Sequence, residues 1–253
     1  MNRALLERMA AGFSQAAAEG RTVVDKGAFS VFLSDSPEPV LSLALPQQDL
    51  RDWTQAIARM EAPFNARNLP PRLEIFAELY PTLGDALERV GFVRTDVAPL
   101  MALTPKDAPL PVTDEACLDL ATEPDLLEPF LYGQSRAYGG SGENALVWLS
   151  QVRAGLASGS LLGVALLQEG EVVAGASVQR GGEVGELAGV WTKPELRRRG
   201  LAERACRVLL TTFFAAGNTL CWLSAAPDAA GLYRKLGFQD AGTQVNYIKE
   251  RSS

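Results

Sequence analysis

The residues best placed to do chemistry lie between positions 189 and 210, where the sequence reads GVWTKPELRRRGLAERACRVLL. A predicted strand ends at Thr192, and the chain then passes through Pro194 and a glycine turn directly into an amphipathic helix. The first backbone N–H groups of a helix have no acceptor inside the helix, and the helix dipole adds partial positive charge there. A turn of this kind is typical of a site for phosphate oxygens.

The side chains around the turn favour the same ligand. Gly200 has no side chain that would block a close approach, and Ala202 is small. Arg197, Arg198 and Arg199 add positive charge beside the start of the helix. Basic loops that only face water are also common, so the turn by itself leaves both interpretations open.

Composition limits the other kinds of chemistry. The chain of 253 residues contains no histidine, which excludes an imidazole base and histidine metal ligands. Its three cysteines lack the spacing of metal ligands, so we expect buried thiols and no bound metal. A net charge of -6 and a pI near 4.9 argue against a nucleic-acid partner.

The chain also lacks an apolar run long enough for a membrane span or a signal peptide. We therefore expect a cytoplasmic protein with no membrane partner. We expect it to be a monomer or a homodimer.

Hydropathy patterning predicts an α+β fold, in which helices flank a mixed, mostly antiparallel central sheet. We expect two domains, 1–105 and 112–253, joined by a linker that contains several prolines. Hairpin turns in the second domain predict a meander of three antiparallel strands before the helix that follows Gly200. The predicted helices cover 3–19, 49–60, 82–90, 124–138, 143–156, 201–215 and 228–236, and the predicted strands cover 29–33, 40–45, 73–79, a segment ending near 103, 117–121, 161–167, 172–179, 184–192, 219–225 and 245–249.

The two halves of the chain look like distant copies of one unit. The segments LERVGF at 87–92 and YRKLGF at 233–238 each close a predicted helix with Gly-Phe, at a similar distance from the start of a predicted strand. Two unrelated helices that end in glycine would also look alike by chance. We expect a duplication of the fold.

Two motifs of the second half resemble those of a known family. RRRGLA resembles the Gln/Arg-x-x-Gly-x-Gly/Ala motif of the GCN5-related N-acetyltransferases, and GLYRKLGF resembles a later motif of the same family. The resemblance covers nearly all of residues 112–250 and implies a tandem fold of this type. Acetyl-CoA is then the cosubstrate, with its pyrophosphate on the turn and its pantetheine arm along the preceding strand. The implied cofactor-binding residues are Val190, Trp191, Thr192, Arg197, Arg198, Arg199, Gly200, Leu201, Ala202 and Tyr233.

The first half departs from this pattern and is expected to be a degenerate copy. Its corresponding turn reads LPQQDL at 45–50, with no glycine and no basic residue. Leu87 stands where the second copy has Tyr233. We therefore expect that the first half does not bind coenzyme A.

The resemblance implies an acyltransferase that moves an acetyl group from acetyl-CoA to a primary amine of a small molecule or peptide, by direct attack in a ternary complex. This reaction uses a base for the amine, donors for the oxyanion and an acid for the departing thiolate. The resemblance places the phenol of Tyr233 beside the sulfur, as the acid. Glu186, an acidic residue inside an apolar strand, is the candidate base, and the backbone N–H of Thr192 or Trp191 is the candidate oxyanion donor.

Two alternatives remain at this point. Glu186 could face water or bind a cationic substrate without acting as a base. The protein could also be a catalytically inactive coenzyme A-binding regulatory module, although the sequence has both Tyr233 and Glu186.

Overall fold

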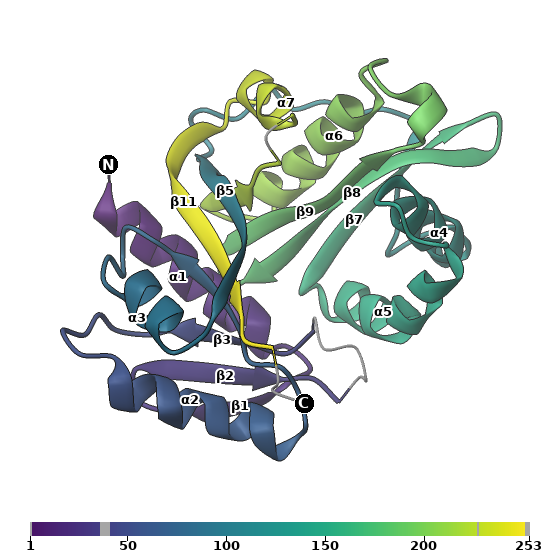
Figure 1. Cartoon of the computed structure of the whole chain (residues 1–253). Coiled ribbons are helices and arrows are strands. Elements are labelled where there is room, and N and C mark those ends of the chain that lie inside the picture. The colour runs from purple at the N-terminus through teal and green to yellow at the C-terminus, as the bar shows by residue number, and fades with distance from the viewer. Residues whose placement is uncertain (1, 36–40, 227, 251–253) are drawn as a thin grey trace. The chain divides into compact units, whose positions relative to one another are not determined.

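The computed structural model describes residues 2–35, 41–226 and 228–250, and the chain divides into two compact units (Figure 1). The first unit contains Met1–Met101, Ser224–Asp228 and Asp240–Ser253. The second unit contains Ala102–Leu223 and Ala229–Gln239. The domain limits 1–105 and 112–253 stay a prediction, but the last strand of the chain is grouped with the first unit.

The first unit is a sheet with the strand order β1-β2-β3-β4-β11-β5. Its helices are α1 (Arg3–Ala18), α2 (Thr54–Ala66) and α3 (Leu83–Arg89), and its strands are β1 (Thr22–Asp25), β2 (Phe29–Leu33), β3 (Leu43–Pro46), β4 (Arg72–Phe76), β5 (Val93–Leu103) and β11 (Gln239–Ile248).

The second unit is a sheet with the strand order β10-β9-β8-β7-β6. Its strands are β6 (Cys117–Asp119), β7 (Leu161–Gln168), β8 (Glu171–Gly181), β9 (Val184–Thr192) and β10 (Leu220–Ser224), and its helices are α4 (Leu127–Ala137), α5 (Leu149–Ser158), α6 (Leu201–Ala215) and α7 (Ala230–Lys235), with short 3-10 turns at Pro124–Leu126, Glu143–Trp148 and Pro194–Leu196.

The two sheets repeat one arrangement. Three antiparallel strands, β1-β2-β3 or β7-β8-β9, lead through a long helix to a fourth strand that runs parallel to the third. The long helix is α2 in the first unit and α6 in the second. This order confirms the mixed, mostly antiparallel sheet and the repeated fold that the sequence predicts.

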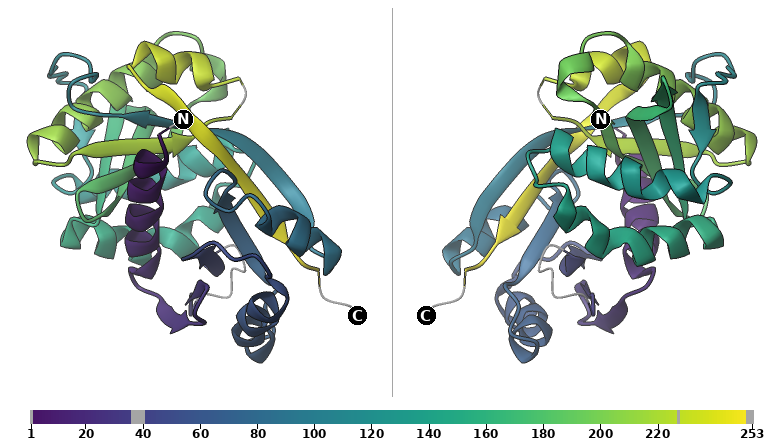
Figure 2. Two further views of the ribbon diagram at one scale, coloured as in Figure 1. Left: turned by 90° about the vertical axis from the view of Figure 1, so that its left-hand side faces the viewer. Right: turned by 90° about the vertical axis from the view of Figure 1, so that its right-hand side faces the viewer.

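Helices cover both faces of the second unit's sheet (Figure 2). On one face, Phe130 of α4 packs edge-on against Trp191 of β9, with ring centroids 5.7 Å apart. On the other face, α6 buries Ala205, Leu209 and Phe213. These helices fix the position of β9, the strand that leads into the turn from Arg197 to Gly200, called the arginine turn below. In the part of the chain that the structure describes, no helix has the length and apolar character needed to cross a membrane.

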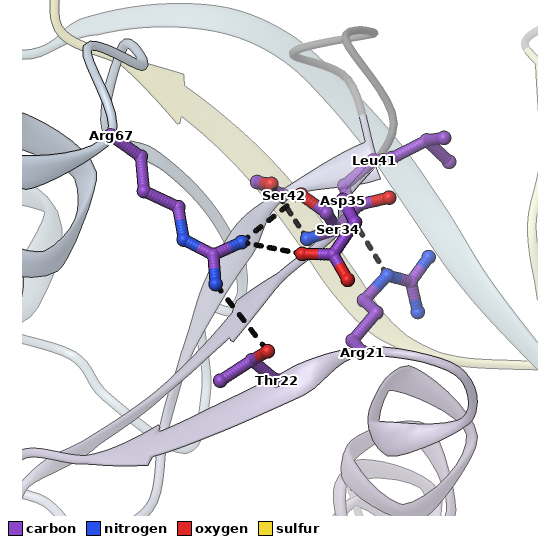
Figure 3. A network of polar contacts seen from close by, with 7 residues as sticks. All are labelled: Arg21, Thr22, Ser34, Asp35, Leu41, Ser42 and Arg67. Atoms are coloured by element: carbon purple, nitrogen blue, oxygen red, sulfur yellow. Dashed lines mark hydrogen bonds and ion pairs between the residues drawn. The ribbon is translucent and has the colours of Figure 1, made fainter.

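Two arginines of the first unit hold the ends of the connection between β2 and β3 (Figure 3). Nη1 of Arg67 donates to the carbonyl oxygen of Ser34 at 3.3 Å and to the carboxylate of Asp35 at 3.1 Å. Nε of Arg21 donates to the carbonyl oxygen of Leu41 at 2.8 Å. The strand predicted at 40–45 falls partly outside the described residues.

Some predicted element limits differ from the structure. The helix predicted at 49–60 begins only at Thr54, because the carboxylate of Asp52 accepts the Thr54 N–H at 2.9 Å and holds the preceding residues in a turn. Strand β1 was not predicted, since its residues are mostly exposed and show no apolar alternation. The strand predicted at 245–249 spans Gln239–Ile248.

Strand β11 completes the first unit although it comes last in the sequence. It pairs antiparallel with β4 from Gln244–Phe76 to Ile248–Arg72. Val245 and Tyr247 are buried at 7% and 3% exposure, and Lys249 forms an ion pair with Glu61 at 2.8 Å. Residues that directly follow α7 of the second unit are therefore part of the first unit's core.

We expect that residues 102–253 expressed alone will be less stable than the intact chain, because β11 loses its partner β4. Burial of one large apolar side chain stabilises a protein by about 1.5–3 kcal/mol, against a total stability of about 5–15 kcal/mol. Thermal unfolding followed by circular dichroism checks this, with co-expressed residues 1–101 as the restoring partner. A fragment that melts like the intact chain would contradict it.

Candidate active site

Strand β9 separates from its neighbour β10 partway along its length. The two strands pair in parallel through Leu220–Val184, Cys221–Gly185 and Trp222–Glu186. β9 continues beyond Glu186 to Thr192, and no further pairing with β10 is formed by the described residues. An unpaired strand edge carries backbone donors and acceptors that another extended molecule can use. Glu186 lies where the separation begins.

The ladder on the other side of β9 shows which backbone groups face this open edge. Lys193 N–H donates to the carbonyl oxygen of Val173 in β8 at 2.8 Å, and the next pair is Thr192 with Ala174. In an antiparallel ladder, successive residues alternate between bonding to the partner strand and facing away from it. The N–H of Thr192 therefore faces away from β8, whereas that of Trp191 faces β8.

The chain runs from this edge into the arginine turn and α6. Gly200 is the N-cap of α6 with φ of 76°, and no side chain caps the helix. Arg198 also has a left-handed backbone, with φ of 65°. Turns that combine such residues direct several N–H groups toward one point, and a cap that supplies no acceptor leaves the first N–H groups of the helix to a ligand.

The charges around α6 leave the turn positive. Arg204 makes a bidentate ion pair with Asp114, with distances of 2.7 and 3.0 Å. The hydrogen bond from Arg204 holds the pKa of Asp114 below its ordinary value, so the pair is ionised at neutral pH and its charges cancel. Arg197, Arg198 and Arg199 lie outside this pair and are exposed.

The end of helix α4 contacts both β9 and the turn. Gln134 Nε2 donates to the carbonyl oxygen of Gly189 at 3.2 Å, and the hydroxyl of Tyr138 donates to that of Val190 at 2.8 Å. Arg197 Nη2 donates to the carbonyl oxygen of Ala137 at 2.9 Å. The motifs did not assign these contacts. The predicted strand 184–192 contains two glycines, Gly185 and Gly189, and a glycine inside a strand could have indicated a bulge.

Tyr233 lies in α7 of the same compact unit. Its side chain is buried at 8% exposure, and its ring packs edge-on against Phe238 with centroids 6.0 Å apart. This packing fixes the ring, so the position of the hydroxyl is set by the helix and not by a mobile side chain.

Most of the predicted site residues lie in one segment, which runs from the end of β9 through the turn to the start of α6. Val190, Trp191 and Thr192 end β9, and the three arginines form the turn. Leu201 is buried against Val173 and Ala174, so only its backbone can reach a ligand. The remaining residues of the predicted set are Glu186 on β9, Gly200 and Ala202 at the start of α6, and Tyr233 on α7.

The corresponding helix of the first unit, α2, has a carboxylate bonded to its first residue. The carboxylate of Asp52 accepts both the N–H of Thr54 at 2.9 Å and its hydroxyl at 2.7 Å. These hydrogen bonds lower the pKa of Asp52, so a negative charge stays at the N-terminus of α2. The N–H of Thr54, the first residue of α2, thus already has an acceptor within the chain.

Comparison with known proteins finds one matching family model, in the part of the chain that contains the candidate site. Residues 131–238 match the sequence model of the "Acetyltransferase (GNAT) family". No curated protein sequence matches the chain.

Solved structures share the fold. A GCN5-related N-acetyltransferase from Kribbella flavida is 23% identical, covers 97% of this chain and 96% of its own, and has a TM-score of 0.76. One from Sphaerobacter thermophilus is 19% identical with a TM-score of 0.61, covering 88% of this chain and 76% of its own. A tandem GNAT protein from the clavulanic acid biosynthesis pathway is 14% identical, with a TM-score of 0.61 and coverage of 89% and 79%. At these identities the likeness shows the fold.

Proposed function

Since residues 131–238 match the sequence model of the acetyltransferase (GNAT) family, we propose that this protein transfers an acetyl group from acetyl-CoA to a primary amine. The observation that carries the proposal is the separation of β9 from β10, which leaves a strand edge that leads directly to an uncapped helix start. A ligand that fits these features has an extended arm with amide groups, which would lie along the strand edge, and a pyrophosphate, which would lie at the start of the helix.

The fit of acetyl-CoA rests on the backbone and the arginines. The edge from Val190 to Thr192 would pair with the pantetheine arm. The turn from Arg197 to Gly200 and the first N–H groups of α6, at Leu201 and Ala202, would hold the pyrophosphate. Asp52 at the start of α2 supports the expectation that the first unit does not bind coenzyme A.

In the proposed reaction, the amine nitrogen forms a bond to the acetyl carbon, the carbon–sulfur bond breaks, and a proton passes from the amine to solvent or base while the thiolate gains one. The N–H of Thr192 faces the open edge and is the better placed oxyanion donor of the two candidates. Tyr233 is proposed as the acid for the thiolate. A free phenol has a pKa of about 10, which is similar to the pKa of the coenzyme A thiol. The phenol can therefore give its proton to the departing thiolate.

The test is a panel of primary amines, amino acids and peptides incubated with acetyl-CoA, with release of free thiol as the readout. Calorimetry with acetyl-CoA alone should give one site per chain. Binding without acetylation of any amine would favour a regulatory coenzyme A-binding module. Two equal sites would contradict the assignment of binding to the second unit.

We expect Glu186→Gln to lower kcat/KM mainly below the pKa of the acceptor amine. There the amine is protonated and needs a base, whereas at higher pH it is already neutral and the defect shrinks. A loss that is independent of pH and appears only as a raised KM for cationic amines would make Glu186 a substrate-binding group.

A further inference from the structure

Three consecutive carbonyl groups of β9 accept hydrogen bonds from side chains. Ala188 accepts from the hydroxyl of Ser177 at 3.1 Å, Gly189 from Gln134 at 3.2 Å and Val190 from Tyr138 at 2.8 Å. Carbonyl groups inside a strand normally accept from the backbone of a neighbouring strand. Side chains donate to all three carbonyl groups of the stretch that leads to Thr192.

A bulge in β9 is the reason. Trp191 pairs with Gly175 and Ala188 pairs with Ser177, so β9 has one more residue than β8 between these pairs. Gly189 has φ of 60°, and a Cβ at this position would overlap the side-chain nitrogen of Gln134. The extra residue leaves the ladder, and its peptide groups need donors from elsewhere.

Each of these bonds also fixes a donor. A peptide group is planar and trans, so its N–H points opposite to its carbonyl oxygen. The bond from Gln134 to the Gly189 carbonyl therefore fixes the direction of the Val190 N–H. The bond from Tyr138 to the Val190 carbonyl fixes that of the Trp191 N–H. These are the peptide groups immediately before Thr192.

We propose that Gln134 and Tyr138 are positioning residues, which hold the bulge of β9 in the one shape that presents the N–H of Thr192 to the acetyl thioester. The proposal rests on the acetyl transfer proposed above. It assigns α4 a part in the reaction that passes through the backbone of β9 and needs no contact with either substrate.

The surroundings of Tyr138 support this role. Its residue surface is 64% exposed, but burial of the hydroxyl end raises the pKa of Tyr138, so the phenol stays a donor at neutral pH. The preceding carbonyl, of Ala137, accepts from Arg197. Gly133, one turn earlier on α4, lies against the ring of Trp191. The end of α4 is therefore held to β9 and to the turn at several points.

The test is Tyr138→Phe, which removes one hydroxyl and keeps the ring. We expect faster amide hydrogen exchange in 188–192, a dissociation constant for acetyl-CoA raised by about three- to tenfold, and a kcat lowered by a similar factor, the range for one neutral hydrogen bond. The KM for the amine should not change. Gln134→Met should act in the same direction.

Tyr80→Phe is the matched control, because the hydroxyl of Tyr80 donates to the carbonyl oxygen of Pro46 at 2.8 Å in the first unit. Tyr80→Phe removes a bond of the same kind and length, and exchange in 188–192 and coenzyme affinity should stay unchanged. The exchange and calorimetric readouts need no amine, so they decide the role of Tyr138 even if no acceptor is acetylated and the proposed function fails.

Two results would overturn the proposal. A raised KM for the amine alone would mean that Tyr138 contacts the acceptor. Tighter binding of acetyl-CoA by Tyr138→Phe would mean that the phenol competes with the coenzyme for the carbonyl of Val190.

Discussion

Replacement of Gly200 by aspartate is expected to weaken acetyl-CoA binding by at least about 100-fold, or about 2.7 kcal/mol. Gly200 has φ of 76°, and a Cβ at this position would meet no other atom within 4 Å. Aspartate tolerates this left-handed backbone better than most residues, so the chain should stay folded. Its carboxylate would then stand at the helix start and repel a pyrophosphate there.

Gly217, just after the end of the same helix, is the matched control. It has φ of 84°, and a Cβ there would also meet nothing within 4 Å. Gly217→Asp carries the same backbone cost and the same charge at the opposite end of α6, and calorimetry should show an unchanged affinity. If Gly200→Asp binds acetyl-CoA as the unchanged protein does, the pyrophosphate lies elsewhere.

The sequence predicted best the elements that depend on local patterning. Strand 184–192 and helix 201–215 have the limits that hydrophobic periodicity and the glycine turn indicate. Both elements are bounded by residues whose effect is local: the hairpin glycines before β9, and Gly200 before α6. The mixed sheet and the repeat of the fold followed from the same signals.

Features that depend on distant residues could not be predicted in this way. Nothing in the sequence of β11 indicates that its partner is β4, since that pairing joins residues more than half the chain apart. The late start of α2 depends on the hydrogen bond that the N–H of Thr54 donates to the carboxylate of Asp52, and this bond competes with the apolar spacing of residues 50–60. Hydrophobic periodicity reports burial and says little about which strand provides it.

For the candidate site, the sequence predicted the local features and missed the contacts between distant residues. The turn and its arginines are contiguous and could be recognised as a phosphate site. The hydrogen bonds from Gln134 and Tyr138 join α4 to a strand far along the chain, and the sequence analysis did not predict them. The roles of Glu186 and Tyr233 stay predictions, because they depend on where the substrates lie.

Tyr233→Phe is expected to lower kcat by about ten- to a thousandfold and leave the affinity for acetyl-CoA nearly unchanged. The substitution keeps the ring that packs against Phe238 and removes only the hydroxyl. A general acid acts in the transition state, so its loss affects kcat and kcat/KM together and not ground-state binding. Steady-state kinetics together with calorimetry measure the two quantities separately.

A packing defect would look different, because Tyr233 is buried at 8% exposure and its ring is part of the core. Tyr233→Leu serves as the comparison: it removes the hydroxyl and also the ring, so its melting temperature should fall while that of Tyr233→Phe stays close to the unchanged protein. If both variants lose the same activity and only the leucine variant loses stability, the hydroxyl carries the catalytic effect. If Tyr233→Phe keeps full kcat, solvent protonates the thiolate, and Tyr233 has only the structural role of anchoring α7.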